Sequence, residues 1–142
     1  MSDKAFLDSN ILIYFYSEDD ERKRNAAYTA LNNHDCVTSV QAMNESSNVW
    51  FRKFNWSASK IKEHLDNIEM VCDEVFPIHR NTINKALSLK ERYGYSYYDC
   101  LMLASALDGN CQIIYTEDMS DGQIINDTLK IVNPFNLYNL VF

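Results

Sequence analysis

Short apolar runs alternate with longer helix-forming segments along this 142-residue chain. The apolar runs are KAFLD (4–8), CVTS (36–39), EVFPI (74–78), QIIYT (112–116) and LKIV (129–132). Segments with helical patterns lie between them, at 10–16, 19–33, 38–53, 57–69, 79–93 and 96–107. This alternation is typical of a mostly parallel sheet that is covered by helices on both faces. We therefore expect an α/β fold with a central sheet of about five strands.

Residues with special backbone roles mark several ends of these segments. Thr38 and Gln41 have the spacing of a capping box, which predicts the start of the helix 38–53. Gly94 fits a C-terminal cap after the helix 79–93, and Gly109 ends the helix 96–107. Pro77 indicates the end of its strand or a position at the edge of the sheet.

Length and composition indicate one globular domain over residues 1–142. Hydrophobic residues make up 46% of the chain and charged residues 23%, so a chain of this length can bury a substantial core. The formal net charge of −7 argues against a broad surface that coats nucleic acid. A local basic patch beside an acidic pocket is still compatible with that charge.

The cysteines and the hydropathy pattern predict the cellular compartment of the protein. Cys36, Cys72, Cys100 and Cys111 form no CxxC pair, so we expect buried free thiols in a reducing compartment rather than disulfides or a zinc site. Asp8 interrupts the first apolar run, which argues against a secretory signal. No run approaches the ~18 residues of a membrane span. We expect a cytoplasmic protein without a membrane segment.

One carboxylate precedes the most apolar helical segment of the chain. Every residue from 100 to 107 is apolar or small, which predicts a helix that is buried nearly all round. Asp99 lies in the first turn of this helix, and a buried carboxylate is costly unless another group compensates it. Ser96 and Asp99 also have the spacing of a capping box, so capping alone is one explanation of this acid.

Three more acids follow predicted strands. Asp8 ends the first run, Asp118 follows the run at 112–116, and Glu45 borders the apolar face of the helix after CVTS. Each also has an ordinary structural explanation: a loop or N-cap for Asp8, a boundary helix position for Glu45 and a turn for Asp118. Parallel strands nevertheless bring such positions to one edge of the sheet, where ligand sites lie.

Four carboxylates at one edge of the sheet would repel one another. Two like charges ~5 Å apart repel by about 3 kcal/mol at an effective dielectric constant of ~20. A cation or raised pKa values would relieve this repulsion. No histidine or cysteine joins the acids in an obvious ligand pattern, and a site made of oxygen ligands suits Mg²⁺ or Mn²⁺ rather than zinc.

Several segments resemble the motifs of PIN-domain ribonucleases, and among them the VapC-type toxins of bacterial and archaeal toxin–antitoxin pairs. These segments are FLDSNILIY (6–14), SVQAMNE (39–45), YSYYDCLMLASAL (95–107), IIYTEDMSDG (113–122) and IVNPF (131–135), in the order of the family. The resemblance implies a three-layer α/β/α sandwich with a mostly parallel sheet. Residues 56–73 match no motif of the family.

The resemblance also implies roles for individual residues. Asp8, Glu45, Asp99 and Asp118 match the catalytic carboxylates that hold one or two Mg²⁺ or Mn²⁺ ions. Ser9, Asn10 and Thr116 match polar residues that support these acids, and Glu117 and Asp121 are further neighbours of these residues in the sequence. The implied activity is metal-dependent hydrolysis of RNA phosphodiester bonds by the toxin of a type II toxin–antitoxin system. A cognate antitoxin and a homodimer are the implied partners.

Two basic clusters are candidates for binding RNA. Arg22, Lys23 and Arg24 form the first, and Arg52 and Lys53 form the second, with Trp50, Phe51 and Trp56 near the second in the sequence. Phosphate contacts combined with base stacking would use both features. The alternative is a solvated helix face with a core aromatic stripe.

Two other functional classes fit parts of the pattern. A PIN-like domain that binds RNA or a partner without cutting would share the fold. A receiver-type phosphoacceptor domain would also carry an acidic Mg²⁺ pocket, but it needs paired acids after the first strand and a lysine after the last. Here Ser9 follows Asp8, and Asn133 follows LKIV, so this class fits less well.

Overall fold

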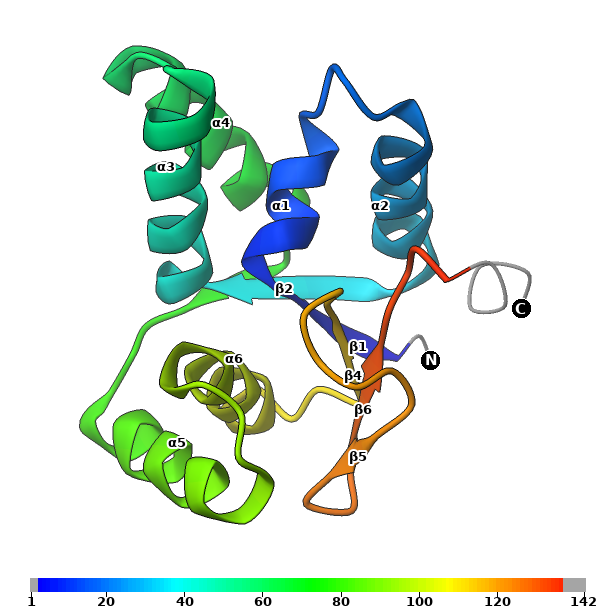
Figure 1. Ribbon diagram of the computed structural model, residues 1–142, viewed down its shortest axis with the longest axis vertical. Helices are drawn as coiled ribbons and strands as arrows, with labels where there is room; N and C mark the ends of the chain where they lie inside the picture. Colours follow the sequence, from blue (N-terminus) through cyan, green and yellow to red (C-terminus); the bar gives the residue numbers. More distant parts are fainter. Residues whose placement is uncertain (1–2, 137–142) are drawn as a thin grey trace.

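The structure, a computed structural model, describes residues 3–136 (Figure 1). Its strands are β1 (Lys4–Leu7), β2 (Asp35–Ser39), β3 (Glu74–Phe76), β4 (Ile113–Tyr115), β5 (Ile124–Ile125) and β6 (Leu129–Val132). Its helices are α1 (Ser9–Phe15), α2 (Glu21–Asn33), α3 (Val40–Phe54), α4 (Ala58–Val71), α5 (Arg80–Tyr93) and α6 (Tyr97–Asp108).

The strands form one mostly parallel sheet in the order β3-β2-β1-β4-β6-β5. All neighbouring pairs are parallel except β5 with β6, which is antiparallel. The predicted α/β class and its five apolar strands are therefore confirmed. The sixth strand, β5, was missed because two residues, Ile124 and Ile125, are too few to form a recognisable apolar run.

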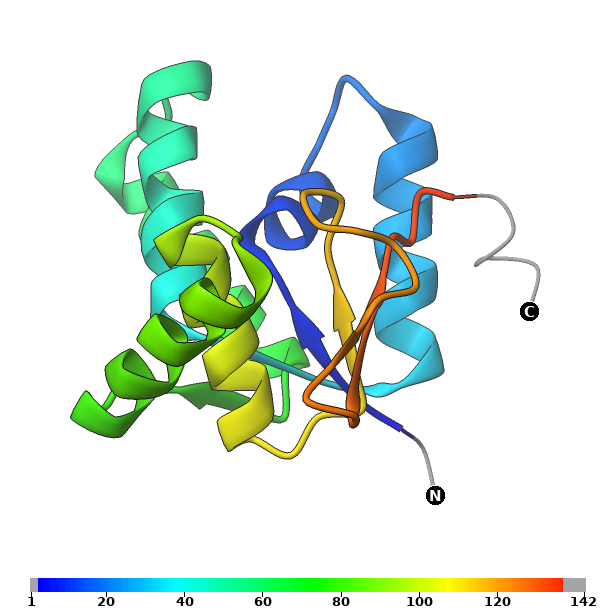
Figure 2. The ribbon, with the colours of Figure 1, turned by 60° about the horizontal axis from the view of Figure 1, so that its bottom comes forward.

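The order of the strands separates the helices into two layers. The chain runs from β1 outward to β2 and β3, then returns to the other side of β1 with β4. Because crossovers between parallel strands are right-handed, this reversal sends the helices of the two halves to opposite faces. In Figures 1 and 2, α1, α2, α3 and α4 lie on one side of the sheet, and α5 and α6 lie on the other.

The core is centred on β1 and α6. Ala5, Phe6 and Leu7 are fully buried, and Phe6 pairs with a residue of β2 on one side and of β4 on the other. The α6 residues from 100 to 106 are also buried, as the apolar run predicted. This burial on all sides holds the first turn of α6 in place.

One predicted helix start was wrong, and one predicted cap is confirmed. Thr38 is still part of β2 and donates a hydrogen bond to the carbonyl of Leu7 at 2.8 Å, so it does not form a capping box with Gln41. Ser39 caps α3 instead, accepting from the backbone N–H of Ala42 at 3.1 Å. Gly94 ends α5 in the left-handed region, at φ 78°, where glycine is preferred.

The predicted state of the thiols is confirmed. All four cysteines are free and buried. Burial raises the pKa of Cys36, Cys72 and Cys111 to about 12, which keeps these thiols protonated and unreactive. Within residues 3–136, no helix has both the length and the apolar character needed to cross a membrane.

Candidate metal centre

The strands β1 and β4 end side by side at the point where the strand order reverses. Leu7 pairs with Tyr115, and the backbone N–H of Asp8 donates to the carbonyl of Tyr115 at 3.1 Å. Asp8 and Thr116 therefore leave the sheet together. In open α/β sheets, ligands bind in the crevice at such a reversal.

Asp8 is a buried carboxylate whose two oxygens both accept hydrogen bonds. It is 2% exposed, and it caps α1 by accepting from the backbone N–H of Ser9 at 2.7 Å. Its other oxygen accepts from the Thr116 hydroxyl at 2.7 Å. Burial raises the pKa of Asp8 to about 6, against the two hydrogen bonds, and the charges of Asp118 and Asp99 add to the rise. A bound cation would favour the ionised form of this acid.

Asn10 and Thr116 link Asp8 to Asp118. Asn10 Nδ2 donates to Asp118 Oδ2 at 2.9 Å and to Thr116 Oγ1 at 3.3 Å. Thr116 Oγ1 also accepts from the backbone N–H of Asp118 at 3.1 Å. Asn10 Oδ1 is buried, and the part of the chain that the structure describes supplies no hydrogen-bond partner for it. A buried oxygen without a partner beside two acids is compatible with a cation in the crevice.

Asp99 completes a group of three acids. One carboxylate oxygen each of Asp8, Asp99 and Asp118 lies within 4.8 Å of the other two. Two oxygen ligands of one Mg²⁺, each ~2.1 Å from the ion, lie about 3–4 Å apart, so small side-chain rotations would let all three bind one ion. Burial raises the pKa of Asp99, and the charge of Asp118 adds to the rise, while a hydrogen bond with Ser96 opposes it. The donor set therefore fits a hard divalent cation.

Glu45, on α3, is not part of that group of three, but it lines a cleft that Asp118 also lines. Gln41 Nε2 donates to Glu45 Oε2 at 3.3 Å. Burial raises the pKa of Glu45 to about 7, and the charge of Asp8 is the next largest cause. The cleft has a volume of about 370 Å³, and its lining residues are Ser9, Asn10, Ile13, Tyr14, Glu45, Val49, Lys53, Phe54, Glu117 and Asp118.

A further acid that lines the cleft, Glu117, is compensated by a lysine. The Tyr14 hydroxyl donates to Glu117 Oε1 at 2.7 Å, and Lys23 Nζ donates to Glu117 Oε2 at 2.9 Å. Lys23 Nζ also donates to the Tyr14 hydroxyl at 2.9 Å. Lys23 is thus held by α1 and by the loop after β4. The sequence did not reveal this pairing, because residues 23 and 117 are joined only through the folded sheet.

The two basic clusters differ in their surroundings. In the first, the side chains of Arg22 and Arg24 donate to the backbone carbonyls of Phe135 and Ser17, at 3.2 and 3.1 Å. In the second, Lys53 lines the acidic cleft, and Arg52 is exposed on the last turn of α3. The second cluster is therefore the better placed of the two to meet a ligand in the cleft.

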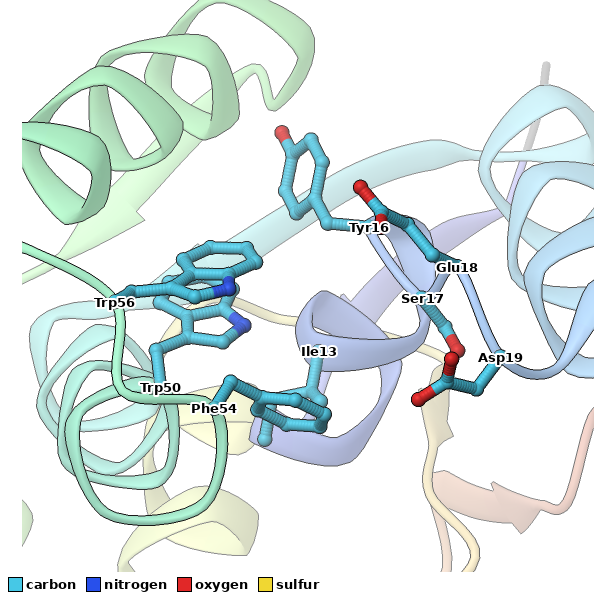
Figure 3. A pocket seen from close by; sticks show the side chains of 8 residues that line it. All are labelled: Ile13, Tyr16, Ser17, Glu18, Asp19, Trp50, Phe54 and Trp56. Carbon is cyan, nitrogen blue, oxygen red and sulfur yellow. The ribbon is translucent and has the colours of Figure 1, made fainter.

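Aromatic side chains line a smaller hollow of about 70 Å³ next to the cleft (Figure 3). Trp50 is buried and stacks on Trp56, with ring centroids 5.0 Å apart and planes 11° apart. Ile13 and Phe54 line both the hollow and the cleft. Lys60 Nζ lies 4.2 Å from the centre of the Trp56 ring, so part of the segment 56–73 encloses this aromatic cluster.

Asp121 lies further along the loop between β4 and β5. It accepts hydrogen bonds from the backbone N–H of Asn133 at 2.9 Å and from Asn136 Nδ2 at 3.0 Å. It is not part of the group of three acids. Asp121 therefore stabilises the approach of the loop to the end of β6.

Comparisons with known proteins identify the family and the fold of the chain. The PIN domain family matches residues 5–120. A toxin–antitoxin complex from Klebsiella pneumoniae contains a chain of similar fold, with a TM-score of 0.69, 20% sequence identity, and coverage of 92% of this chain and 97% of that chain. The Mycobacterium tuberculosis toxin VapC20, described as cleaving the sarcin–ricin loop, gives a TM-score of 0.64 at 16% identity, covering 80% of this chain and 89% of that chain.

FitAcB from Neisseria gonorrhoeae gives a TM-score of 0.65 at 17% identity, covering 94% of this chain and 99% of that chain. At such identities these likenesses concern the fold. No curated protein matches the chain significantly. The family match runs from β1 to the loop after β4, and so includes Asp8, Glu45, Asp99 and Asp118. The chain belongs to the PIN domain family.

Proposed function

We propose that this protein is a Mg²⁺- or Mn²⁺-dependent endoribonuclease. The observation that carries the proposal is the group formed by Asp8, Asp99 and Asp118, whose carboxylate oxygens lie within 4.8 Å of one another at the reversal of strand order. Three carboxylates this close together repel one another, and Asp8 is also buried, so the arrangement is costly until a divalent cation offsets the cost. Membership of the PIN domain family supports the same conclusion.

We assign a separate role in this activity to each residue of the site. Asp8, Asp99 and Asp118 would hold the ion, and Glu45 would complete the acidic lining from α3. Thr116 and Asn10 fix the orientation of Asp8 and Asp118 through the hydrogen bonds described above. A divalent ion bound there would activate water and compensate the charge that develops on a phosphodiester. Lys53 and Arg52 would contact the RNA backbone near the mouth of the cleft.

We further propose that the protein is the toxin of a type II toxin–antitoxin pair. The structures of similar fold include a toxin–antitoxin complex and a VapC toxin, which supports a protein antitoxin as the natural partner. A homodimer and a cytoplasmic location follow from the same proposal. Production of the protein in a bacterial host is expected to arrest growth, and production with its cognate antitoxin is expected to restore it.

Cleavage of RNA is tested with a mixed pool of RNAs. The purified protein is treated with EDTA, dialysed, and assayed with and without Mn²⁺. We expect no cleavage without metal, and discrete products once Mn²⁺ is returned. If the protein binds RNA in Mn²⁺ but never cuts it, it is a non-catalytic PIN-like binding domain and the proposal is wrong.

A further inference from the structure

The loop that carries Asp118 is held from two sides. Toward β1, Asn10 and Thr116 bind Asp118 directly. Toward α6, the Tyr95 hydroxyl accepts a hydrogen bond from the backbone N–H of Ser120 at 3.0 Å and donates one to the side chain of Gln123. The second attachment therefore begins just after Asp118 in the sequence.

Tyr95 belongs to the short connection between α5 and α6. It precedes Ser96, whose hydroxyl caps α6 by accepting from the backbone N–H of Asp99 at 3.2 Å. The carbonyl of Tyr95 accepts from Lys90 Nζ at 3.2 Å, and its ring packs against the core, so this side chain has little freedom to move. Its hydroxyl ties the start of α6 to the loop after β4.

We propose that Tyr95 is a positioning residue that sets the separation between the carboxylates of Asp99 and Asp118. This inference rests on the proposed function. Asp8 and Asp118 are linked through Thr116 and Asn10, whereas among residues 3–136 no hydrogen bond joins the Asp99 carboxylate to either acid. The separation between Asp99 and Asp118 therefore depends on how the start of α6 is held against the loop that carries Asp118.

This dependence matters because a divalent cation tolerates little error in the placement of its ligands. A site must hold its groups within about 0.5 Å of the working geometry, and residues behind the ligands supply that precision. Loss of the Tyr95 hydroxyl would let the loop move relative to α6 without changing any carboxylate. The expected consequence is weaker metal binding by a protein that is otherwise folded.

The test compares Tyr95→Phe with Tyr93→Phe. Tyr93 is a matched control, because its hydroxyl accepts from the backbone N–H of Asn126 at 2.9 Å and so anchors the turn between β5 and β6 instead of the loop that carries Asp118. Both variants keep the aromatic ring and lose one hydroxyl. We expect calorimetric titration with Mn²⁺ alone to show an increase in Kd of about tenfold for Tyr95→Phe, and of less than about twofold for Tyr93→Phe. Thermal melting of the metal-free variants checks that both lose similar stability.

Cleavage assays add a second measurement. The rate of Tyr95→Phe should fall at limiting Mn²⁺ and return toward the parent rate at saturating Mn²⁺, while the KM for RNA changes little. If Tyr95→Phe melts well below Tyr93→Phe, Gln123→Met removes only the acceptor of the Tyr95 hydroxyl and should raise the Kd for Mn²⁺ by a smaller factor.

The outcomes separate this inference from the proposed function. Equal Kd values for Mn²⁺ in the Tyr95→Phe and Tyr93→Phe variants would overturn the positioning role while the enzyme stands. Failure of the unchanged protein to bind Mn²⁺ would overturn both.

Discussion

Asp8 and Asp118 stand at the ends of neighbouring strands and are tied together by hydrogen bonds, whereas Asp99 and Glu45 stand on helices that approach from other parts of the chain. We call these the strand-borne pair and the helix-borne pair. Thr116 and Asn10 orient the first pair, while capping by Ser96 and contact with Gln41 are the local supports of the second. The strand-borne pair is therefore a fixed half-site, and the helix-borne pair completes it through tertiary packing.

The largest expected effect comes from removing a helix-borne acid. Asp99→Asn should lower the rate of RNA cleavage by about a thousandfold or more, because a metal ligand contributes several kcal/mol of charge stabilisation. Asp108→Asn, at the other end of α6, is the control, since Asp108 binds Thr82 and Lys85 far from the cleft. Circular dichroism and melting should show both variants folded. Cleavage by Asp99→Asn at the parent rate in saturating Mn²⁺ would remove Asp99 from the site.

The next effect concerns the link within the strand-borne pair. Thr116→Val removes the hydroxyl that joins Asp8, Asn10 and Asp118, and should weaken Mn²⁺ binding by roughly 10- to 100-fold. Thr38→Val is a matched control, because Thr38 is an equally buried threonine whose hydroxyl binds the carbonyl of Leu7 instead. Each variant should lose about 1 kcal/mol of unfolding free energy. If both bind Mn²⁺ equally well, the link through Thr116 does not organise the site.

A pH-dependent effect is expected from Glu45. Its pKa is about 7 in the folded protein, because of burial first and the charge of Asp8 second, and about 4.3 in an unfolded chain. The folded state therefore binds the Glu45 proton more tightly than the unfolded state does. This contribution to the free energy of unfolding is fully present below about pH 4 and is lost as the pH rises through about 7.

Glu45→Gln removes the ionised form, so the metal-free variant should melt above the parent at about pH 8 and with the parent at about pH 4. The difference should be small, ~1 kcal/mol or ~3 °C, because the side chain is half-exposed and solvent screens its charge. Glu69→Gln, on the exposed surface of α4, is the control. Identical melting temperatures of Glu45→Gln and the parent at the higher pH would show that the folded protein does not disfavour the ionised form of Glu45.

The smallest effect distinguishes the two basic clusters. Lys53→Gln should weaken RNA binding roughly threefold and lower the slope of log K against log salt by about 0.7, as expected for the loss of one phosphate contact with a single strand. Lys23→Gln should leave that slope unchanged, because Lys23 already pairs with Glu117. Filter binding in Ca²⁺ over a range of salt concentrations measures both. Equal slopes for Lys53→Gln and the parent would exclude Lys53 from the RNA contacts.

The fold was largely predictable because the central strands β1, β2 and β4 are mostly buried on both faces and therefore read as short, largely apolar runs. The same runs located Asp8 directly after β1 and Asp118 in the loop after β4, since residues that follow such strands lie at the edge of the sheet. Local patterns were less informative about hydroxyl partners. Thr38 had the spacing of a cap, yet the neighbouring strand supplied a better partner in the carbonyl of Leu7.

The parts that could not be predicted are contacts between residues far apart in the sequence. Lys23 looked like a phosphate ligand, and only the folded chain brings Glu117 to it. Tyr95 lay within a segment that resembles the family, but its anchoring contacts could not be predicted, because its partners Ser120 and Gln123 lie on a loop far along the sequence. Ion pairs and hydrogen bonds of this kind depend on which residues the fold brings close together. The periodicity of hydrophobic residues carries no information about those distances.

The central claim is that Asp8, Asp99 and Asp118 share one divalent cation. The most direct test is a crystal of the protein grown with Mn²⁺ and measured near the manganese absorption edge. We predict an anomalous peak within bonding distance of a carboxylate oxygen of each of these three acids. A crystal in Mn²⁺ at a concentration that supports cleavage, with no peak between these acids, would contradict the account.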